Sequence, residues 1–274
     1  MNGWRLILSG RASGSFNMAL DEAIMQCFRK GAPPTLRLYG WSPACVSVGY
    51  FQSVDRDIDM EGCRRLGIDV VRRPTGGRAI LHDDELTYSV AGSLDDPHLS
   101  GSVNQSYRKI AAAIAEGLSI MGVEVEEWGT APGPWGRAET GACFGAVWGH
   151  ELSVGGRKLV ASAQTRRGGV VLQHGSILLG VDLSGLASVL KTGDKRSMES
   201  TLRSRLTTLS ELLGRRVDAK EAAAALQLGF ERALGVALEE GQPTDEEMAL
   251  AASLMTEKYG KPAWNLARAA RGMG

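Results

Sequence analysis

The chain has 274 residues, of which 43% are hydrophobic and 23% charged, a composition typical of a globular enzyme. Its 31 basic and 31 acidic residues cancel, so no overall positive field draws the protein to nucleic acid or to an anionic membrane. The first residues hold no apolar run long enough for a signal peptide, and no later stretch reaches the ~18 apolar residues of a membrane span. We therefore expect a cytoplasmic protein that binds neither nucleic acid nor a membrane.

In the first half of the chain the patterns alternate between helix and strand. Apolar residues at three- and four-residue spacing predict a helix over residues 16–29, with Ser15 as its cap. Shorter apolar or alternating runs predict strands at residues 35–39, 44–49, 68–71, 79–81 and 86–91. The first two of these strands flank a Gly-Trp-Ser-Pro turn, which predicts a hairpin. Helices are expected over 58–66 and 103–121, and the second is the clearest in the chain.

The second half begins with a loop and ends with helices. Two prolines and four glycines within residues 128–141 exclude a regular strand ladder there and predict a loop. The turn Gly155-Gly156 predicts a hairpin of strands 151–154 and 157–161. Further strands are expected at 170–172 and 176–179. Beyond about residue 183 the pattern is helical, notably at residues 219–233 and 246–258.

The four cysteines differ in their sequence surroundings. They show neither C-x-x-C spacing nor a close His/Cys cluster, so we expect free thiols and no metal site. Cys27, Cys45 and Cys63 lie in helix-like or strand-like runs, where free cysteine packs as a small hydrophobe. Cys143 instead follows the loop at 128–141, where a substrate can reach its thiol.

A nucleophilic thiol also needs a lowered pKa or a nearby base. The candidates for activating Cys143 are Lys158, Arg78, His82 and His150. The sequence alone does not choose among them.

The segment Arg72-Arg-Pro-Thr-Gly-Gly-Arg78 is a second candidate for function. Gly76 and Gly77 follow a predicted strand, and two glycines permit backbone conformations that let a ligand approach closely. The neighbouring arginines could bind an anion or orient a carbonyl group. The alternative is a glycine turn with solvated arginines.

Lys158 begins a strand and is followed by the small residues Ala161, Ser162 and Ala163. These leave room for a slender group beside the backbone, and a lysine next to an acyl group can stabilise a tetrahedral oxyanion. An exposed strand lysine is the alternative. Histidines such as His82 and His174 are more often structural than catalytic.

Four motifs in this order resemble the family of lipoate-protein ligases and octanoyltransferases, which is related to biotin ligases. They are RRPTGGRAILHD at 72–83, GACF at 141–144, GRKLVASAQTR at 156–166 and QHGSILL at 173–179. The segments FNMALDEA at 16–23 and RLYGWSPACVSVGYFQ at 37–52 are similar to this family as well. The resemblance covers residues 4–180 strongly and the remainder loosely.

The resemblance implies an α/β (α+β) fold, a mixed β-sheet flanked by helices with a helical C-terminal extension. We expect residues 1–240 to form the catalytic domain and residues 241–274 to extend the same domain. Within the family the chain is most similar to octanoyltransferases of the Gram-positive type. These need no cofactor, and they move octanoyl from octanoyl-acyl carrier protein through a cysteine thioester to a lysine of a lipoyl carrier, especially the glycine-cleavage H protein.

The resemblance also implies the roles of particular residues. Cys143 matches the cysteine that carries the acyl group, and Lys158 matches the lysine near the acyl carbonyl. The acyl-binding residues would be Arg72, Gly76, Gly77, Arg78, His82, Ala161 and Ser162.

Three alternatives remain from the sequence: an ATP-dependent lipoate-protein ligase, an octanoyl amidotransferase between lipoyl carriers, and a carrier-binding protein without chemistry. Arg78 stands where ligases commonly have a third glycine, which favours the transferase. Gly145 is a departure, because close relatives are expected to have an acidic residue there.

Overall fold

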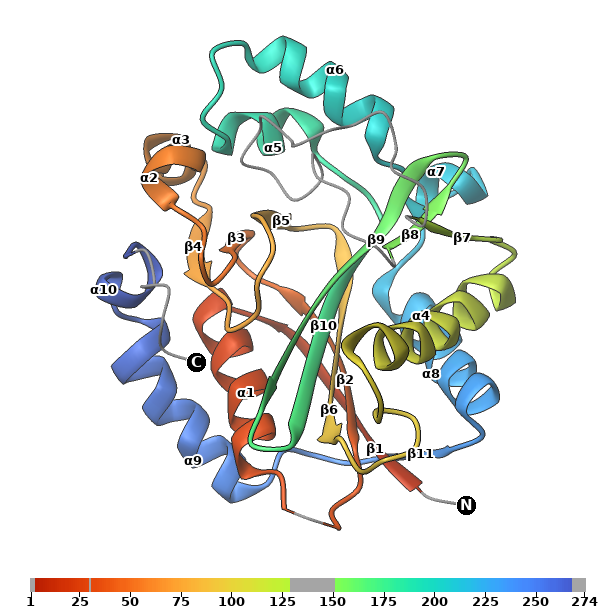
Figure 1. The fold of residues 1–274 in the computed structure, drawn as a ribbon. Coiled ribbons are helices and arrows are strands. Elements are labelled where there is room, and N and C mark those ends of the chain that lie inside the picture. Colours follow the sequence, from red (N-terminus) through yellow and green to blue (C-terminus); the bar gives the residue numbers. More distant parts are fainter. Residues whose placement is uncertain (1–2, 30, 129–150, 268–274) are drawn as a thin grey trace.

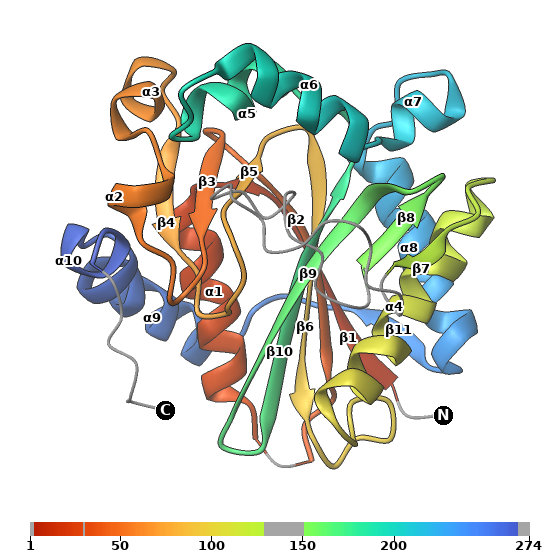
Figure 2. The ribbon, with the colours of Figure 1, turned by 45° about the horizontal axis from the view of Figure 1, so that its top comes forward.

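A mixed β-sheet of eight strands lies at the centre of the computed structural model, which describes residues 3–29, 31–128 and 151–267 (Figures 1 and 2). In spatial order its strands are β11 (Ala237–Glu240), β1 (Gly3–Ala12), β2 (Thr35–Trp41), β6 (Glu85–Ser93), β10 (Val170–Leu178), β9 (Arg157–Arg167), β8 (Glu151–Val154) and β7 (Glu126–Trp128). A smaller sheet has the order β4 (Asp69–Arg72), β3 (Cys45–Val48) and β5 (Ile80–His82). The predicted fold class, a mixed sheet flanked by helices, is confirmed.

The predicted hairpin of residues 35–39 and 44–49 is wrong. β2 pairs with β1 on one side and with β6 on the other, while β3 pairs with β4 and β5 in the smaller sheet. All seven residues of β2 are buried, as expected of a central strand in a sheet that is covered on both faces. The Gly-Trp-Ser-Pro segment therefore carries the chain from one sheet to the other.

Two other parts of the sheet differ from the prediction. The strands expected at 170–172 and 176–179 form the single strand β10, because Gln173, His174 and Gly175 stay paired with both β6 and β9. The edge pair of β1 and β11 was not predicted from the sequence. The hairpin of β8 and β9 is confirmed, with positive φ at both glycines of its turn (54° and 72°).

Helices cover both faces of the eight-stranded sheet (Figure 1). On one face α4 (Val103–Ile120) and α8 (Ala219–Leu234) pack together over a core that includes Leu36, Leu38 and Tyr88. On the other face α1 (Gly14–Cys27) lies between the sheet and α9 (Asp245–Leu254).

The remaining helices are short. They are α2 (Val54–Asp57), α3 (Met60–Arg65), α5 (Leu183–Val189), α6 (Lys195–Arg205) and α7 (Leu209–Leu213). The first four adjoin the smaller sheet, where a third apolar core has formed (Figure 2).

Helix α1 begins earlier than predicted. Its cap is Ser13 rather than Ser15, since the Ser13 side chain accepts a hydrogen bond from the backbone N–H of Phe16 at 3.3 Å. Asn17, Asp21 and Glu22 are buried polar residues of this helix. The two acidic residues, Asp21 and Glu22, pair with Arg37 of β2 and with Lys258.

The C-terminal extension is helical, as predicted, and packs on α1. It consists of α9, a π-helical turn (Met255–Tyr259) and α10 (Pro262–Asn265). The Lys258 ammonium lies 2.6 Å from the Glu22 carboxylate, and the Tyr259 hydroxyl donates to the same group. The division of the chain at residue 240 stays a prediction.

The described residues hold no helix with the length and apolar character needed to cross a membrane. Over the same ranges no three His, Cys, Asp or Glu side chains gather in a way that could hold a metal ion.

Candidate functional site

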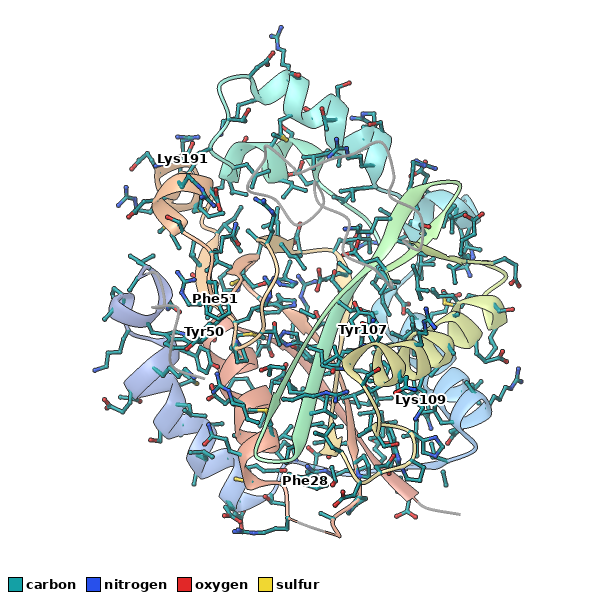
Figure 3. The ribbon with its side chains drawn as sticks, viewed as in Figure 1. Phe28, Tyr50, Phe51, Tyr107, Lys109 and Lys191 are labelled. Atoms are coloured by element: carbon teal, nitrogen blue, oxygen red, sulfur yellow. The ribbon has the colours of Figure 1, made fainter. Side chains whose placement is uncertain are left out.

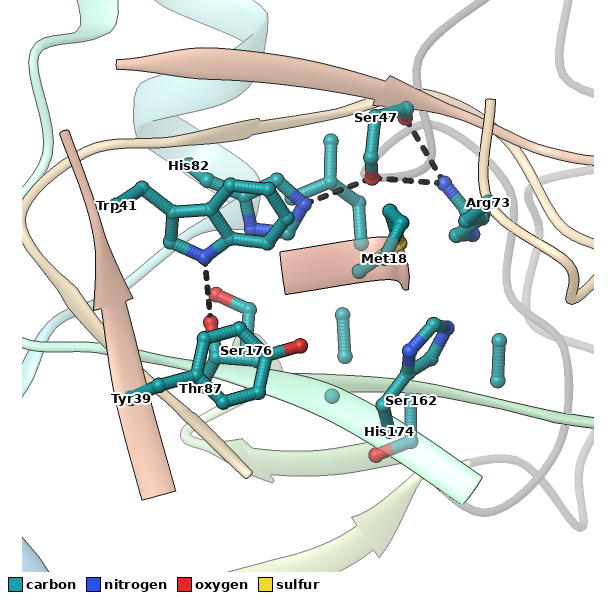
Figure 4. Close-up of a pocket in the computed structure, with 14 residues that line it drawn as sticks. Met18, Tyr39, Trp41, Ser47, Arg73, His82, Thr87, Ser162, His174 and Ser176 are labelled. Carbon is teal, nitrogen blue, oxygen red and sulfur yellow. Dashed lines mark hydrogen bonds between the residues drawn. The ribbon is translucent and has the colours of Figure 1, made fainter. Parts of the chain in front are cut away.

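A small cavity of about 20 Å³ lies between α1, the large sheet and the smaller sheet (Figure 4). Its walls combine apolar, small and polar side chains. The lining residues are Met18, Tyr39, Trp41, Ser47, Arg73, Ile80, His82, Thr87, Ala161, Ser162, Ala163, His174, Gly175 and Ser176. Three of the residues predicted to bind the acyl group, His82, Ala161 and Ser162, are among them.

His82 is fixed on one side of the cavity by three neighbours. Its ring stacks on Trp41 with centroids 4.0 Å apart, and its Nε2 lies 2.7 Å from the Ser47 hydroxyl (Figure 4). Its Nδ1 lies 2.8 Å from the Glu85 carboxylate. The tight turn between β5 and β6 makes this possible, because it brings His82 and Glu85 together three residues apart.

The charge state of Glu85 determines which ring nitrogen of His82 carries the proton. Burial opposes ionisation of Glu85, but His82 and the hydroxyl donors Ser176 and Thr87 outweigh it, so the pKa of this carboxyl is lowered. An ionised carboxylate only accepts hydrogen bonds, so Nδ1 of His82 must donate to it. In the neutral ring Nε2 then accepts from the Ser47 hydroxyl.

His174 occupies a matching position on the other side of the cavity. Its Nδ1 lies 3.2 Å from the Asp21 carboxylate and its Nε2 lies 2.7 Å from the Thr75 hydroxyl. Burial lowers the pKa of His174, although Asp21 opposes this. The ring is therefore neutral near pH 7, donates from Nδ1 and accepts from Thr75.

Asp21 is ionised because it is surrounded by donors. Burial alone would raise its pKa, but the Arg37 guanidinium at 2.7 Å and His174 lower it. The Tyr39 hydroxyl also donates to Asp21, at 2.8 Å. Arg37 and Asp21 are both fully buried, so the pair anchors α1 to β2 beneath the cavity.

Arg73 lines the cavity and holds the glycine segment in place. Its guanidinium donates to the carbonyl oxygens of Gly76 and Arg78 at 2.7–3.1 Å and to the Ser47 hydroxyl at 3.1 Å. Gly77 has a φ of +93°, which favours glycine. Gly76, Gly77 and Arg78 themselves lie outside the lining, so their predicted contact with an acyl group stays a prediction.

Arg72, by contrast, points away from this cavity. It donates to the backbone carbonyl oxygens of Gly49, Tyr50 and Gln52 at 2.7–3.1 Å, and its Nε donates to the carbonyl oxygen of Trp264 at 3.1 Å. These contacts tie β4 to the C-terminal extension. Its predicted part in acyl binding remains untested.

Lys158 is buried near the start of β9, outside the cavity lining. Its ammonium lies 2.5 Å from the Glu151 carboxylate, and the two side chains are 3% and 4% exposed. Burial raises the pKa of Glu151, although Lys158 opposes this. The alternative of an exposed strand lysine is therefore wrong, while the catalytic role of Lys158 stays a prediction.

Cys143 and His150 lie outside the described residues, as does the predicted loop at 128–141 beyond Trp128. The cysteines within the described ranges carry thiols that resist ionisation. Burial raises the pKa of Cys45 well above its usual value and that of Cys63 to about 11, and burial beside acidic residues raises that of Cys27. None of these three has the lowered pKa of a reactive thiol.

Sequence reasoning missed several residues of the cavity wall, including Met18, Tyr39, Trp41, Ser47 and Thr87. All lie on regular elements rather than in loops. The sequence feature that could have identified them is the presence of polar residues in strands that are otherwise apolar. Ser47 and Thr87 are examples, at 1% and 2% exposed. Buried polar side chains need partners, and here the partners are His82, Trp41 and Glu85.

The chain is similar in sequence to known proteins over most of its length. Residues 13–231 match the family model of the lipoyl protein ligase A/B catalytic domain. The chain is similar to octanoyltransferase LipM of Bacillus subtilis (strain 168), at 39% identity over 97% of this chain and 98% of that protein. It is likewise similar to octanoyltransferase LipM of Symbiobacterium thermophilum, at 44% identity over 96% and 98%.

Solved structures of ligases share the fold. A bipartite lipoate protein ligase from Thermoplasma acidophilum, studied with its E2 lipoyl domain, has a TM-score of 0.83 and 28% identity over 99% of this chain and 100% of that one. A lipoate-protein ligase A bound with ATP has a TM-score of 0.81 and 28% identity over 96% and 98%.

Proposed function

The chain belongs to the family of the lipoyl protein ligase A/B catalytic domain, and we propose that it carries octanoyl as a thioester on Cys143 before passing it to a lysine of a lipoyl carrier. It is an acyltransferase, and its near-full-length relatives support octanoyl transfer in lipoate biosynthesis. The observation that carries the proposal is the cavity described above, because residues from the motifs at 72–83, 156–166 and 173–179 line it.

The cavity would receive the acyl chain. Met18, Ile80, Ala161 and Ala163 provide apolar surface, and each buried methylene contributes about 0.8 kcal/mol. The cavity is narrow, at about 20 Å³, so we expect side chains to turn aside when an eight-carbon chain enters. Met18 is suited to this, because methionine is unbranched and adaptable.

Two steps complete the transfer. The Cys143 thiolate attacks the thioester carbonyl of octanoyl-acyl carrier protein, the carrier thiolate leaves and takes up a proton, and an acyl-enzyme remains. The lysine amine of the lipoyl carrier then attacks the acyl-enzyme, loses a proton and releases the Cys143 thiolate. Lys158 would stabilise the oxyanion in both steps.

The base for Cys143 is His82 or His150. His82 carries its proton on Nδ1, against Glu85, which leaves Nε2 as the basic nitrogen. Nε2 is occupied by the Ser47 hydroxyl at 2.7 Å, so His82 can act as a base only if Ser47 turns away. Removing the Ser47 hydroxyl would then leave the reaction intact or accelerate it.

The partners follow from the same proposal. The donor is octanoyl-acyl carrier protein and the acceptor is a lipoyl carrier, especially the glycine-cleavage H protein. The reaction needs no nucleotide, and we place it in the cytoplasm.

An ATP-dependent ligase is the second candidate, because the two solved structures above are ligases. Three substrate pairs distinguish the functions on an added lipoyl domain. Modification by octanoyl-acyl carrier protein without ATP supports the transferase, modification by octanoate with Mg-ATP supports the ligase, and modification by an octanoylated second lipoyl carrier supports the amidotransferase. The proposal is overturned if octanoyl-acyl carrier protein without ATP fails to modify the lipoyl domain while one of the other two mixtures modifies it.

A further inference from the structure

The turn at residues 49–53 carries an exposed aromatic side chain beside the glycine segment. Phe51 is 54% exposed, the highest value among the large apolar side chains that the described residues expose. It packs edge-on against Tyr50, with ring centroids 4.8 Å apart, and Tyr50 in turn contacts Trp264 at 5.7 Å. Figure 3 shows Tyr50 and Phe51 together near β4, on the side of the C-terminal helices.

This turn is held rigidly from inside the protein. Nη1 of Arg72 donates to three carbonyl oxygens of the turn, those of Gly49, Tyr50 and Gln52. The Gln52 amide also donates to Asp57, at 3.0 Å. An aromatic side chain has few rotatable bonds, so on a fixed turn it loses little conformational entropy on binding.

The turn also touches the segment that borders the cavity. The backbone N–H of Tyr50 donates to the carbonyl oxygen of Thr75 at 2.9 Å, and Thr75 is the residue that holds His174. Gly49 lies so close to Gly77 that a Cβ atom at Gly49 would be 1.9 Å from the Gly77 carbonyl oxygen. A partner seated on Phe51 is therefore adjacent to the predicted acyl-binding segment.

Two arginine side chains near the turn are exposed. Arg56 follows in α2 with its side chain 69% exposed, whereas its partner Asp57 is 6% exposed. Arg167 lies 6.0 Å from the Tyr50 ring with its side chain 45% exposed, whereas its partner Glu22 is 2% exposed. The guanidinium groups thus face solvent while their carboxylate partners are buried, although Asp55 of α2 is also exposed.

We propose that residues 49–53, with Arg56 and Arg167, form the docking surface for the acyl donor carrier protein. The inference rests on the proposed function and adds the surface where the donor binds. An acyl carrier is acidic, and its phosphopantetheine arm brings a phosphate group, for which arginine is the preferred partner. The lipoyl acceptor has no phosphopantetheine arm, so the arginines favour the donor.

Single-turnover acylation of the enzyme tests this, with two donors compared for each variant. The donors are octanoyl-acyl carrier protein and the small thioester octanoyl-N-acetylcysteamine. We expect Phe51→Ala to lower the second-order rate constant with the carrier about tenfold. The rate constant with the small thioester should stay within about twofold of wild type, since Phe51 lies outside the cavity lining.

Two further variants complete the design. Leu228→Ala is the matched control, because Leu228 is 43% exposed on α8, across the large sheet from α1 and α9, and both rate constants should be unchanged. Arg167→Gln should reduce the salt dependence of the carrier reaction. Thermal unfolding of each variant checks that it is folded.

Three results would contradict the assignment of this surface to the donor carrier. Phe51→Ala could leave the carrier reaction unchanged, or slow both donors equally, which would mean that the turn acts on the cavity. It could also slow only the transfer from preformed acyl-enzyme to a lipoyl domain, which would assign the surface to the acceptor. If wild type forms no acyl-enzyme even with the small thioester, the proposed function itself fails.

Discussion

Replacing Lys158 by methionine separates a structural role of this lysine from a catalytic one. The substitution leaves the Glu151 carboxylate buried without its partner at 2.5 Å. Breaking a buried ion pair costs ~3–5 kcal/mol, and protonation of Glu151 limits the loss, so we expect about 3 kcal/mol at pH 8. Acyl transfer should fall by about 10²–10³, the range for losing an oxyanion partner.

The loss of stability depends on pH in a defined direction. The pKa of Glu151 in the folded protein is already raised by burial, and without Lys158 it rises further. Below the unfolded pKa of ~4.5 the carboxyl is neutral in both states and the penalty vanishes. As the pH rises through the folded pKa the penalty appears in full, so the variant should lose more stability at pH 8 than at pH 5.

Urea unfolding at pH 5, 6.5 and 8, together with transfer rates at a temperature where all variants are folded, provides the assay. The double variant Lys158→Met/Glu151→Gln should recover most of the stability and none of the activity. If the double variant recovers transfer as well, Lys158 is structural. If the single variant shows the same loss of stability at every pH, no buried carboxylate was left behind.

Three further predictions concern the cavity wall and the buried ion pair beneath it. Asp21→Asn leaves Arg37 buried without its counter-charge, and should lower the free energy of unfolding by ~3 kcal/mol in urea titrations. Gly175→Ala places a Cβ atom 2.5 Å from the Ala161 carbonyl oxygen, and should cost ~1–3 kcal/mol and slow acylation. His174 has a lowered folded pKa, so its contribution to stability is complete above the unfolded pKa of ~6.5 and is lost as the pH falls towards the folded pKa. His174→Gln should reduce that acid-induced loss in unfolding measured between pH 7 and 5.

Two controls accompany these predictions. Glu199→Gln breaks the exposed pair with Arg203 and should cost less than about 0.5 kcal/mol. Gly193→Ala has open space around its Cβ position and should be nearly neutral. Equal effects of Asp21→Asn and Glu199→Gln, or of the two glycine substitutions, would contradict the reasoning from burial. A His174→Gln variant with the pH dependence of wild type would show that His174 is not the titrating group.

The helices were the most predictable part of the fold. The amphipathic pattern of α4 fixed its range almost to the residue, because an apolar face repeating every three to four residues is a local property. Strand pairing is not local. Residues 35–39 and 44–49 were predicted to form a hairpin because a turn lies between them. In the structure β2 instead pairs with β1 and β6, where its side chains are buried on both faces of the sheet.

In the candidate site, too, local sequence patterns were readable and contacts between distant residues were not. The motifs singled out from the sequence include His82 and Ala161, which line the cavity, since small residues and histidine stand out in a sequence. The partners could not be read from it: Asp21 and His174 are 153 residues apart and meet only because α1 packs on β10. Arg72 and Arg73 are neighbours in sequence, yet only Arg73 lines the cavity.

The most direct test of the thioester mechanism is intact-protein mass spectrometry after mixing the enzyme with octanoyl-acyl carrier protein and no ATP. Wild type should gain the mass of one octanoyl group, hydroxylamine should remove it, and Cys143→Ala should gain nothing. If neither protein gains mass, while octanoate with Mg-ATP modifies an added lipoyl domain, the enzyme is a ligase and the account of Cys143 is wrong.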